Sequence, residues 1–129
     1  MIRLLGLFTS INYLPEQNMP ILPNAYQACI PREKLTDYVL NPMHPVGKHK
    51  AKVFFSVLNL TADDAEALEK VILRAVLHAE AKPTRFDEYG QRFEVEVTFE
   101  RNERNVVILT AWIIETGTDI PRLTSCYIK

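Results

Sequence analysis

The stretch GQRFEVEVTFE, residues 90–100, decides the fold. From Phe93 to Phe99 every second residue is apolar, and the residues between them are glutamate or threonine. Because side chains alternate between the two faces of a β-strand, this period predicts a strand with one buried and one wet face. The pattern starts near Lys82, and turn-forming residues at 89–90, 101–105 and 117–121 divide the region into four segments. We therefore predict a four-stranded antiparallel meander from about 82 to 128.

The preceding part of the chain has a helical period. Within 32–41, 48–58 and 61–78, apolar residues recur at three and four positions, which predicts three helices. Pro42 ends the first helix, and Thr61 followed by two aspartates marks the start of the third. The predicted fold class is α+β, with N-terminal helices packed on the sheet. The expected core consists of Phe54, Phe55, Leu68, Ile72, Val95, Val97, Leu109 and Ile113.

The N-terminal region differs from both halves. Four prolines between residues 12 and 31 disfavour a helix, so residues 1–31 are predicted to form an extended arm that wraps the domain. The remaining residues, 32–129, are expected to be a single α+β domain, because a chain of 129 residues supports one core better than two.

Composition narrows the classes of partner. The formal net charge of −1 gives no overall attraction to phosphate backbones, so any contact with nucleic acid needs a local basic patch. Cys29 and Cys126 have no metal-site spacing and are expected to be reduced thiols. The short apolar start lacks a cleavage site, and no stretch is long enough to span a bilayer. We expect a cytoplasmic protein with no membrane association and no cofactor.

A basic cluster lies in HPVGKHKAKVFF, residues 44–55. His49 is the best acid–base candidate because imidazole titrates near neutrality, and Lys48 and Lys50 flank it. The cations suit an anionic ligand. The alternative is a solvated, basic helix start without a function. His44 is expected to be a loop residue, because its spacing from His49 does not match a helical metal pair, and no metal site is expected.

The last two strands carry a second group of polar and aromatic side chains, namely Thr110, Trp112, Arg122, Ser125 and Tyr127. In one interpretation they form a surface that stacks on bases and holds phosphate through hydroxyls and a guanidinium. In the other, Trp112 and Tyr127 are core aromatics with a hydrogen-bonding edge.

Three short motifs, PNA (23–25), LNP (40–42) and GKHKA (47–51), carry a wider resemblance. Over about residues 22–128 the chain resembles a small bacterial family described as a domain of unknown function, DUF6883-like. Such domains look like parts of polymorphic-toxin and toxin–antitoxin systems. The predicted order of helices and strands is also similar to that of the barnase/EndoU/colicin/RelE type of small ribonuclease.

This resemblance implies a metal-independent endoribonuclease-like toxin domain that acts on RNA and has a cognate antitoxin or toxin protein as partner. The catalytic candidates are His49, Lys50, Thr110 and Ser125. The candidates for substrate binding are Lys48, Trp112, Arg122 and Tyr127. The alternative is a non-enzymatic interaction module, such as an immunity or antitoxin protein, which the acidic balance and the long apolar strands favour.

Overall fold

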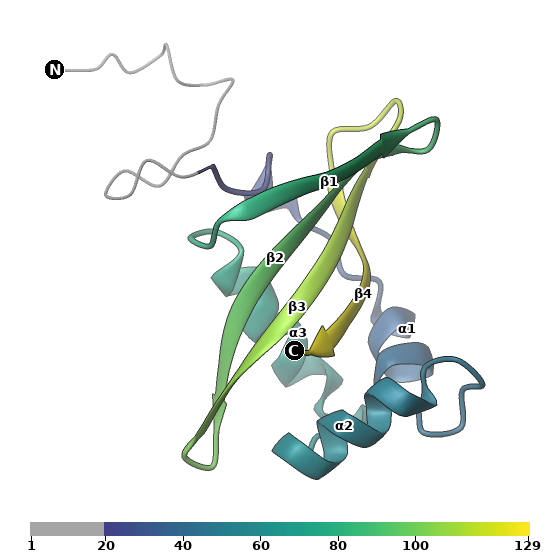
Figure 1. Cartoon of the computed structure of the whole chain (residues 1–129), viewed down its shortest axis with the longest axis vertical. Helices are drawn as coiled ribbons and strands as arrows, with labels where there is room; N and C mark the ends of the chain where they lie inside the picture. The colour runs from purple at the N-terminus through teal and green to yellow at the C-terminus, as the bar shows by residue number, and fades with distance from the viewer. Residues whose placement is uncertain (1–19) are drawn as a thin grey trace, which may run out of the picture.

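The computed structural model describes residues 20–129, so most of the arm predicted for residues 1–31 lies outside the described residues (Figure 1). The elements follow in the order α1 (Arg32–Lys34), α2 (Lys48–Leu58), α3 (Ala65–Ala75), β1 (Ala81–Asp87), β2 (Gly90–Arg101), β3 (Arg104–Glu115) and β4 (Pro121–Ile128). Three short turns of helix complete the list: η2 (Ala25–Gln27), η3 (Leu35–Val39) and η4 (Ala62–Asp64).

The sheet has the order β1-β2-β3-β4, and all three pairs of neighbours are antiparallel. The central pair is continuous from Gly90 opposite Glu115 to Arg101 opposite Arg104. The predicted α+β fold with a four-stranded meander is therefore confirmed, and the turns fall where the sequence placed them.

The helices agree with the prediction over most of their length. The second spans the predicted residues and ends at Asn59, whose left-handed φ of 57° stops it. The first is α-helical only over α1 and continues as a single π-turn, η3. The third begins with the η4 turn, capped by Thr61, and its α-helical part ends at Ala75, three residues before the predicted end.

The helices cover one face of the sheet, and the main core lies between them (Figure 1). Val95 and Val97 of β2 point into this core, as predicted. Their partners across β3 are Thr110 and Ile108, so the face of β3 that carries Thr110 and Trp112 is the one that meets the helices.

Three residues of the predicted core lie elsewhere. Leu109 and Ile113 are buried, but they sit opposite Glu96 and Arg92 on the other face of the sheet, outside the helix-facing core. Phe55 is 56% exposed because it lies on the flank of α2 rather than on its inner face. The burial predicted for Leu109 and Ile113 is confirmed, although they lie on the face of β3 that points away from the helices, whereas the prediction is wrong for Phe55.

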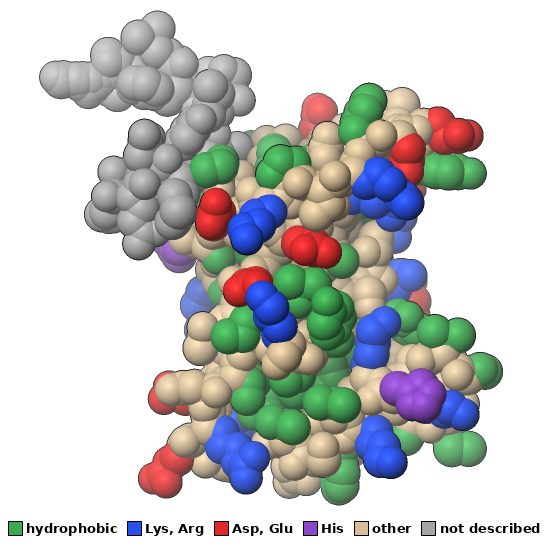
Figure 2. All heavy atoms as spheres, in the orientation of Figure 1, with side chains coloured by type: hydrophobic (Ala, Val, Ile, Leu, Met, Phe, Trp, Pro, Cys, Tyr) green, Lys and Arg blue, Asp and Glu red, His purple; other side chains and the backbone are tan. Residues whose placement is uncertain are grey.

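The open face of the sheet combines apolar and charged side chains (Figure 2). Val107, Leu109, Ala111 and Ile113 form a stripe along β3. The neighbouring strand contributes glutamates, and Lys129 pairs with Glu96 across the stripe. Long charged side chains can cover apolar surface with their stems, which explains why Leu109 is only 7% exposed.

Residues 20–31 contribute to the domain. Leu22 and Ile30 are part of the main core. Cys29 runs beside the first residues of β4, where its N–H donates to Pro121 O (2.8 Å) and its carbonyl accepts from Leu123 N (2.9 Å). In residues 20–129, no helix is both long enough and apolar enough to cross a membrane.

Candidate functional site

Hydrogen bonds between side chains and backbone stabilise the loop 41–47. Asn41 accepts a hydrogen bond from Met43 N at 2.9 Å and donates one to Asp37 O at 3.2 Å. His44 Nδ1 accepts from Val46 N at 3.0 Å and from Gly47 N at 2.9 Å. Because Nδ1 is an acceptor, the neutral ring carries its proton on Nε2. The motif 40–51 therefore builds a fixed turn into α2.

Gly47 packs this turn against the π-turn η3. A Cβ at this position would lie 2.1 Å from the carbonyl oxygen of Tyr38 and 2.8 Å from its ring. The φ of Gly47 is −75°, which any residue adopts, so the need for glycine comes from this close approach and not from the backbone angle. The loop and Tyr38 are thus held together.

Tyr38 is the centre of a small polar cluster. Lys50 Nζ donates to its hydroxyl at 3.0 Å, and the same Nζ is 4.8 Å from the ring centroid. The His44 ring meets the Tyr38 ring edge to face, with centroids 4.8 Å apart. The hydrogen bond from Lys50 lowers the pKa of Tyr38, partial burial opposes this shift, and the charges of Lys50 and Lys34 support it. Tyr38 and Lys50 therefore form a hydrogen-bonded pair.

Ser125 reaches the same cluster from β4. The register changes between Ala111 and Trp112, which are opposite Ser125 and Leu123, so Thr124 is an extra residue in β4. The Ser125 hydroxyl is buried, makes no aligned hydrogen bond among the described residues, and helps to lower the pKa of Tyr38. The next residue, Cys126, is buried, which raises its pKa to about 12 and keeps the thiol protonated.

The other basic residues of α2 lie on different sides of the helix. Lys48 and Lys52 are each about 200° around the helix axis from Lys50. They border an open groove of about 760 Å³ that His49 also lines. The remaining lining residues are Leu40, Pro42, Ala51, Phe55, Leu60, Thr61, Ala62 and Asp63. The predicted basic cluster is therefore divided between the Tyr38 cluster and the groove.

Thr110 and Trp112 are buried in the core and do not reach this surface. The Thr110 hydroxyl donates to Val95 O at 2.7 Å and accepts from Trp112 Nε1 at 2.8 Å. Their exposed fractions are 0% and 1%. Of the two interpretations of Trp112, the structure matches the core aromatic.

Arg122 and Tyr127 lie apart from the Tyr38 cluster. Arg122 is paired with Glu115 at 3.1 Å, near the start of β4. Tyr127 is 41% exposed and borders a hollow on the open face of the sheet, together with Leu109 and two glutamates of β2. Of the eight candidate residues, only Lys50 and Ser125 reach the Tyr38 cluster, while Lys48 and His49 line the groove. Thr110 and Trp112 are bonded to each other in the core.

Tyr38 and His44 were missed as site residues. In the sequence, Tyr38 is simply one of the residues at helical spacing in the first predicted helix, and His44 is expected to be a loop residue. The available signal was the motif 40–51 itself, because its asparagine, histidine and glycine imply a built turn. Tyr38 lies outside the motif, and only the folded chain shows that Gly47 and His44 pack against it.

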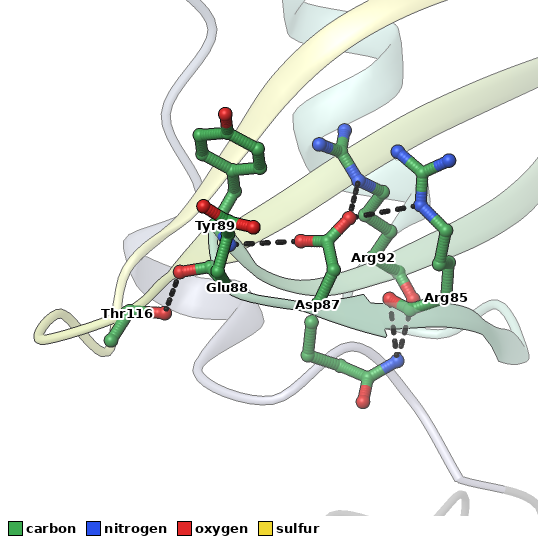
Figure 3. Close-up of polar contacts among 7 residues, drawn as sticks. Arg85, Asp87, Glu88, Tyr89, Arg92 and Thr116 are labelled. Carbon is green, nitrogen blue, oxygen red and sulfur yellow. Dashed lines mark hydrogen bonds and ion pairs between the residues drawn. The ribbon is translucent and has the colours of Figure 1, made fainter.

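A second polar cluster lies at the β1–β2 turn (Figure 3). Asp87 Oδ2 is 3.0 Å from Arg85 Nε and 3.8 Å from Arg92 Nε, and Oδ1 accepts from Tyr89 N at 2.9 Å. The backbone hydrogen bond is the largest cause that lowers the pKa of Asp87. These contacts stabilise the turn between β1 and β2.

Metal ligands do not gather in the described part of the chain. Among residues 20–129, no three histidine, cysteine, aspartate or glutamate side chains are close enough to hold one ion.

The fold and the site define a class of small α+β domain. In it, the π-turn η3, the loop 41–47 and the bulged strand β4 surround a hydrogen-bonded pair, Tyr38 and Lys50. The family model for the domain of unknown function DUF6883 matches residues 21–129. The chain belongs to this family, and the resemblance seen in its motifs is confirmed. No curated protein and no solved structure shows a significant match.

Proposed function

We propose that this chain is a metal-independent endoribonuclease-like toxin domain of a bacterial toxin–antitoxin or polymorphic-toxin system, and that it acts in the cytoplasm. The observation that supports this proposal best is the hydrogen bond between Tyr38 and Lys50, at 3.0 Å, in a cluster held by the most distinctive motif of the chain.

The chemistry of this class needs a base, an acid and a cation. The base takes the proton of a ribose 2′-hydroxyl, whose oxygen then attacks the adjacent phosphorus. The bond to the 5′ oxygen breaks, the acid returns a proton to that oxygen, and a 2′,3′-cyclic phosphate is left. Tyr38 is the proposed base, because its lowered pKa raises the share of phenolate. Lys50 supplies positive charge for the phosphoryl oxygens.

Two residues proposed from the sequence are kept in this mechanism, but the role of His49 changes, because the sequence favoured it as the group that accepts the 2′-hydroxyl proton. His49 is exposed on the first turn of α2 and is the proposed proton donor, and Lys48 beside it is proposed to hold a flanking phosphate. Ser125 is proposed as a positioning residue for the Tyr38 hydroxyl, because it lies close enough to help lower the pKa of Tyr38. Buried Thr110 and Trp112 have no part in it.

The test is cleavage of a mixed-sequence single-stranded RNA by the purified chain in the presence of a chelator. We expect Tyr38→Phe, Lys50→Ala and His49→Ala each to slow cleavage by about 100-fold, the usual contribution of a positioned acid or base. Lys70→Ala is the matched control, since Lys70 is an exposed lysine of α3. Absence of cleavage by the unaltered chain, or unchanged rates in Tyr38→Phe and Lys50→Ala, would refute the mechanism.

The alternative function is a non-enzymatic interaction module, such as an immunity or antitoxin protein. The groove beside α2 favours it, because Phe55 is 56% exposed there. Expression of the chain alone in bacteria separates the two functions. Growth arrest that Lys50→Ala relieves supports the toxin, whereas harmless expression at high level supports the interaction module.

A further inference from the structure

We propose that the groove between α2 and residues 60–63 binds an acidic amphipathic helix of a partner protein. The inference does not depend on ribonuclease activity, because the Tyr38–Lys50 pair lies on the other flank of α2 from the groove. His49 and Lys48 border the groove and are the residues that the two proposals share.

The floor of the groove is aliphatic with one exposed aromatic ring. Leu40, Ala51 and Leu60 line the groove and are at most 5% exposed, so they belong to the core as well. Phe55 lines the same groove and is 56% exposed. A hollow of this kind accepts the apolar side chains that an amphipathic helix presents at intervals of three and four residues.

The border of the groove on the α2 side is positively charged. Lys48 and Lys52 are four residues apart, which puts them about 6 Å apart along the helix axis, and His49 lies next to them. Helix α2 contains no acidic residue, and within residues 20–129 neither lysine takes part in an ion pair. This row of charge is available to a ligand.

The arrangement of these charges selects an extended anionic ligand. A small anion is held by cations that converge on one point, but Lys48 and Lys52 are spread along the edge of the groove. Carboxylates at positions i and i+4 of a helix have the same spacing. An RNA strand matches less well, because the floor is mostly aliphatic and offers little for bases to stack on.

The wall opposite α2 is well fixed. Thr61 and Asp64 form a reciprocal capping box, and Asp64 also pairs with Arg101 of β2 at 3.4 Å. The groove is therefore preformed, which lowers the entropic cost of binding.

The probe for the experiment is a fluorescent synthetic helix of about 18 residues, with leucines at every third or fourth position and glutamates on the flanks. Two further peptides serve as controls, one with the same composition in scrambled order and one with lysine in place of glutamate. We expect saturable binding of the acidic amphipathic peptide alone, measured by fluorescence anisotropy. Amide shifts in NMR spectra should map to residues 40–42, 48–55 and 60–63.

Substitutions locate the site. Phe55→Ala and the double variant Lys48→Glu/Lys52→Glu should each weaken binding at least about tenfold. Phe86→Ala is the matched control, because Phe86 is 76% exposed on β1, away from the groove, and it should leave binding unchanged. Lys50→Ala and Tyr38→Phe should also leave it unchanged, which separates this proposal from the ribonuclease proposal.

Four outcomes would overturn the inference. They are no saturable binding, equal binding of the scrambled peptide, amide shifts on the open face of the sheet, and tighter binding of a short single-stranded RNA with the same sensitivity to Phe55→Ala and Lys48→Glu/Lys52→Glu. The last result would make the groove a nucleic-acid site.

Discussion

Thr110 shows how a single hydroxyl serves the core at the residue scale. It donates to the carbonyl of Val95 and accepts from the Trp112 indole, so the hydroxyl and the indole N–H are both paired inside the core. A buried donor without a partner costs more than the net contribution of the hydrogen bond itself. The residue is polar because the indole beside it needs an acceptor.

We predict that Thr110→Val lowers the free energy of unfolding by about 1–3 kcal/mol, because the indole N–H of Trp112 loses its acceptor. Thr98→Val is the control, since Thr98 is exposed on β2 and its loss should be near zero. Urea titration followed by tryptophan fluorescence measures both. Equal stabilities for the two variants would show that the indole finds another partner.

Tyr38 gives a second prediction at this scale. The ammonium of Lys50 lowers the pKa of Tyr38 from its ordinary value of 10.0, so Tyr38 should lose its proton at lower pH than an exposed tyrosine. Ultraviolet difference absorbance during alkaline titration should show a low-pH component that Tyr38→Phe removes. Lys50→Met should move this component to higher pH. A component that persists in Tyr38→Phe belongs to another tyrosine.

At the scale of elements, the sequence determined β2 and α2 well because their patterns are decided by the elements themselves. The alternation of β2 and the helical period of α2 need no knowledge of the rest of the fold. The expected core grouped Leu109 and Ile113 with Val95 and Val97, although the two pairs lie on opposite faces of the sheet. Both faces of β3 are largely apolar, and only the register with β2 decides which of them meets the helices. Tyr38 was missed because its partner Lys50 is 12 residues away in the chain, so their contact follows from the folded structure and not from a local pattern.

The start of the third helix depends on a pH-sensitive cap. Asp64 accepts from Thr61 N at 2.9 Å, and this backbone hydrogen bond is the largest cause that lowers its pKa below 3.8, with Arg101 adding to it. A carboxyl group with a lowered pKa stabilises the fold in full above the unfolded-state pKa. This contribution is lost as the pH falls below 3.8 and through the lower folded-state value.

We therefore predict that Asp64→Asn is less stable than the unaltered chain at neutral pH and that the difference shrinks at acid pH. Thr61→Ala removes the capping hydroxyl and should cost about 1 kcal/mol at either pH. Thermal unfolding at neutral and acid pH measures both effects. If the stability gap of Asp64→Asn is the same at pH 7 and at about pH 3, its carboxylate does not carry the effect.

At the scale of the whole molecule, the sheet separates two apolar surfaces of different kinds. Ile108 faces the helices and is fully buried, whereas its neighbour Leu109 lies under the side chains of Glu96 and Lys129 on the open face.

Ile108→Ala should lower the free energy of unfolding by about 2–5 kcal/mol, because a cavity forms in a packed core. Leu109→Ala should cost less than about half of that, because the flexible stems above it can settle into the space. Chemical denaturation of the two variants tests this difference, and equal losses would mean that the open face is packed as firmly as the core.

The two outer strands bear on how copies of the molecule behave at high concentration. Strand β1 has Pro83 in its middle, a register break between Pro83 and Phe86, and charged side chains at Lys82 and Arg85. At the other edge of the sheet, Cys29 forms backbone hydrogen bonds with Pro121 and Leu123 of β4. Sheets with exposed, regular margins recruit strands from other molecules and grow into fibrils. Here one edge is irregular and the other is partly paired, so within residues 20–129 the sheet presents no long, regular edge onto which a strand of another copy could add.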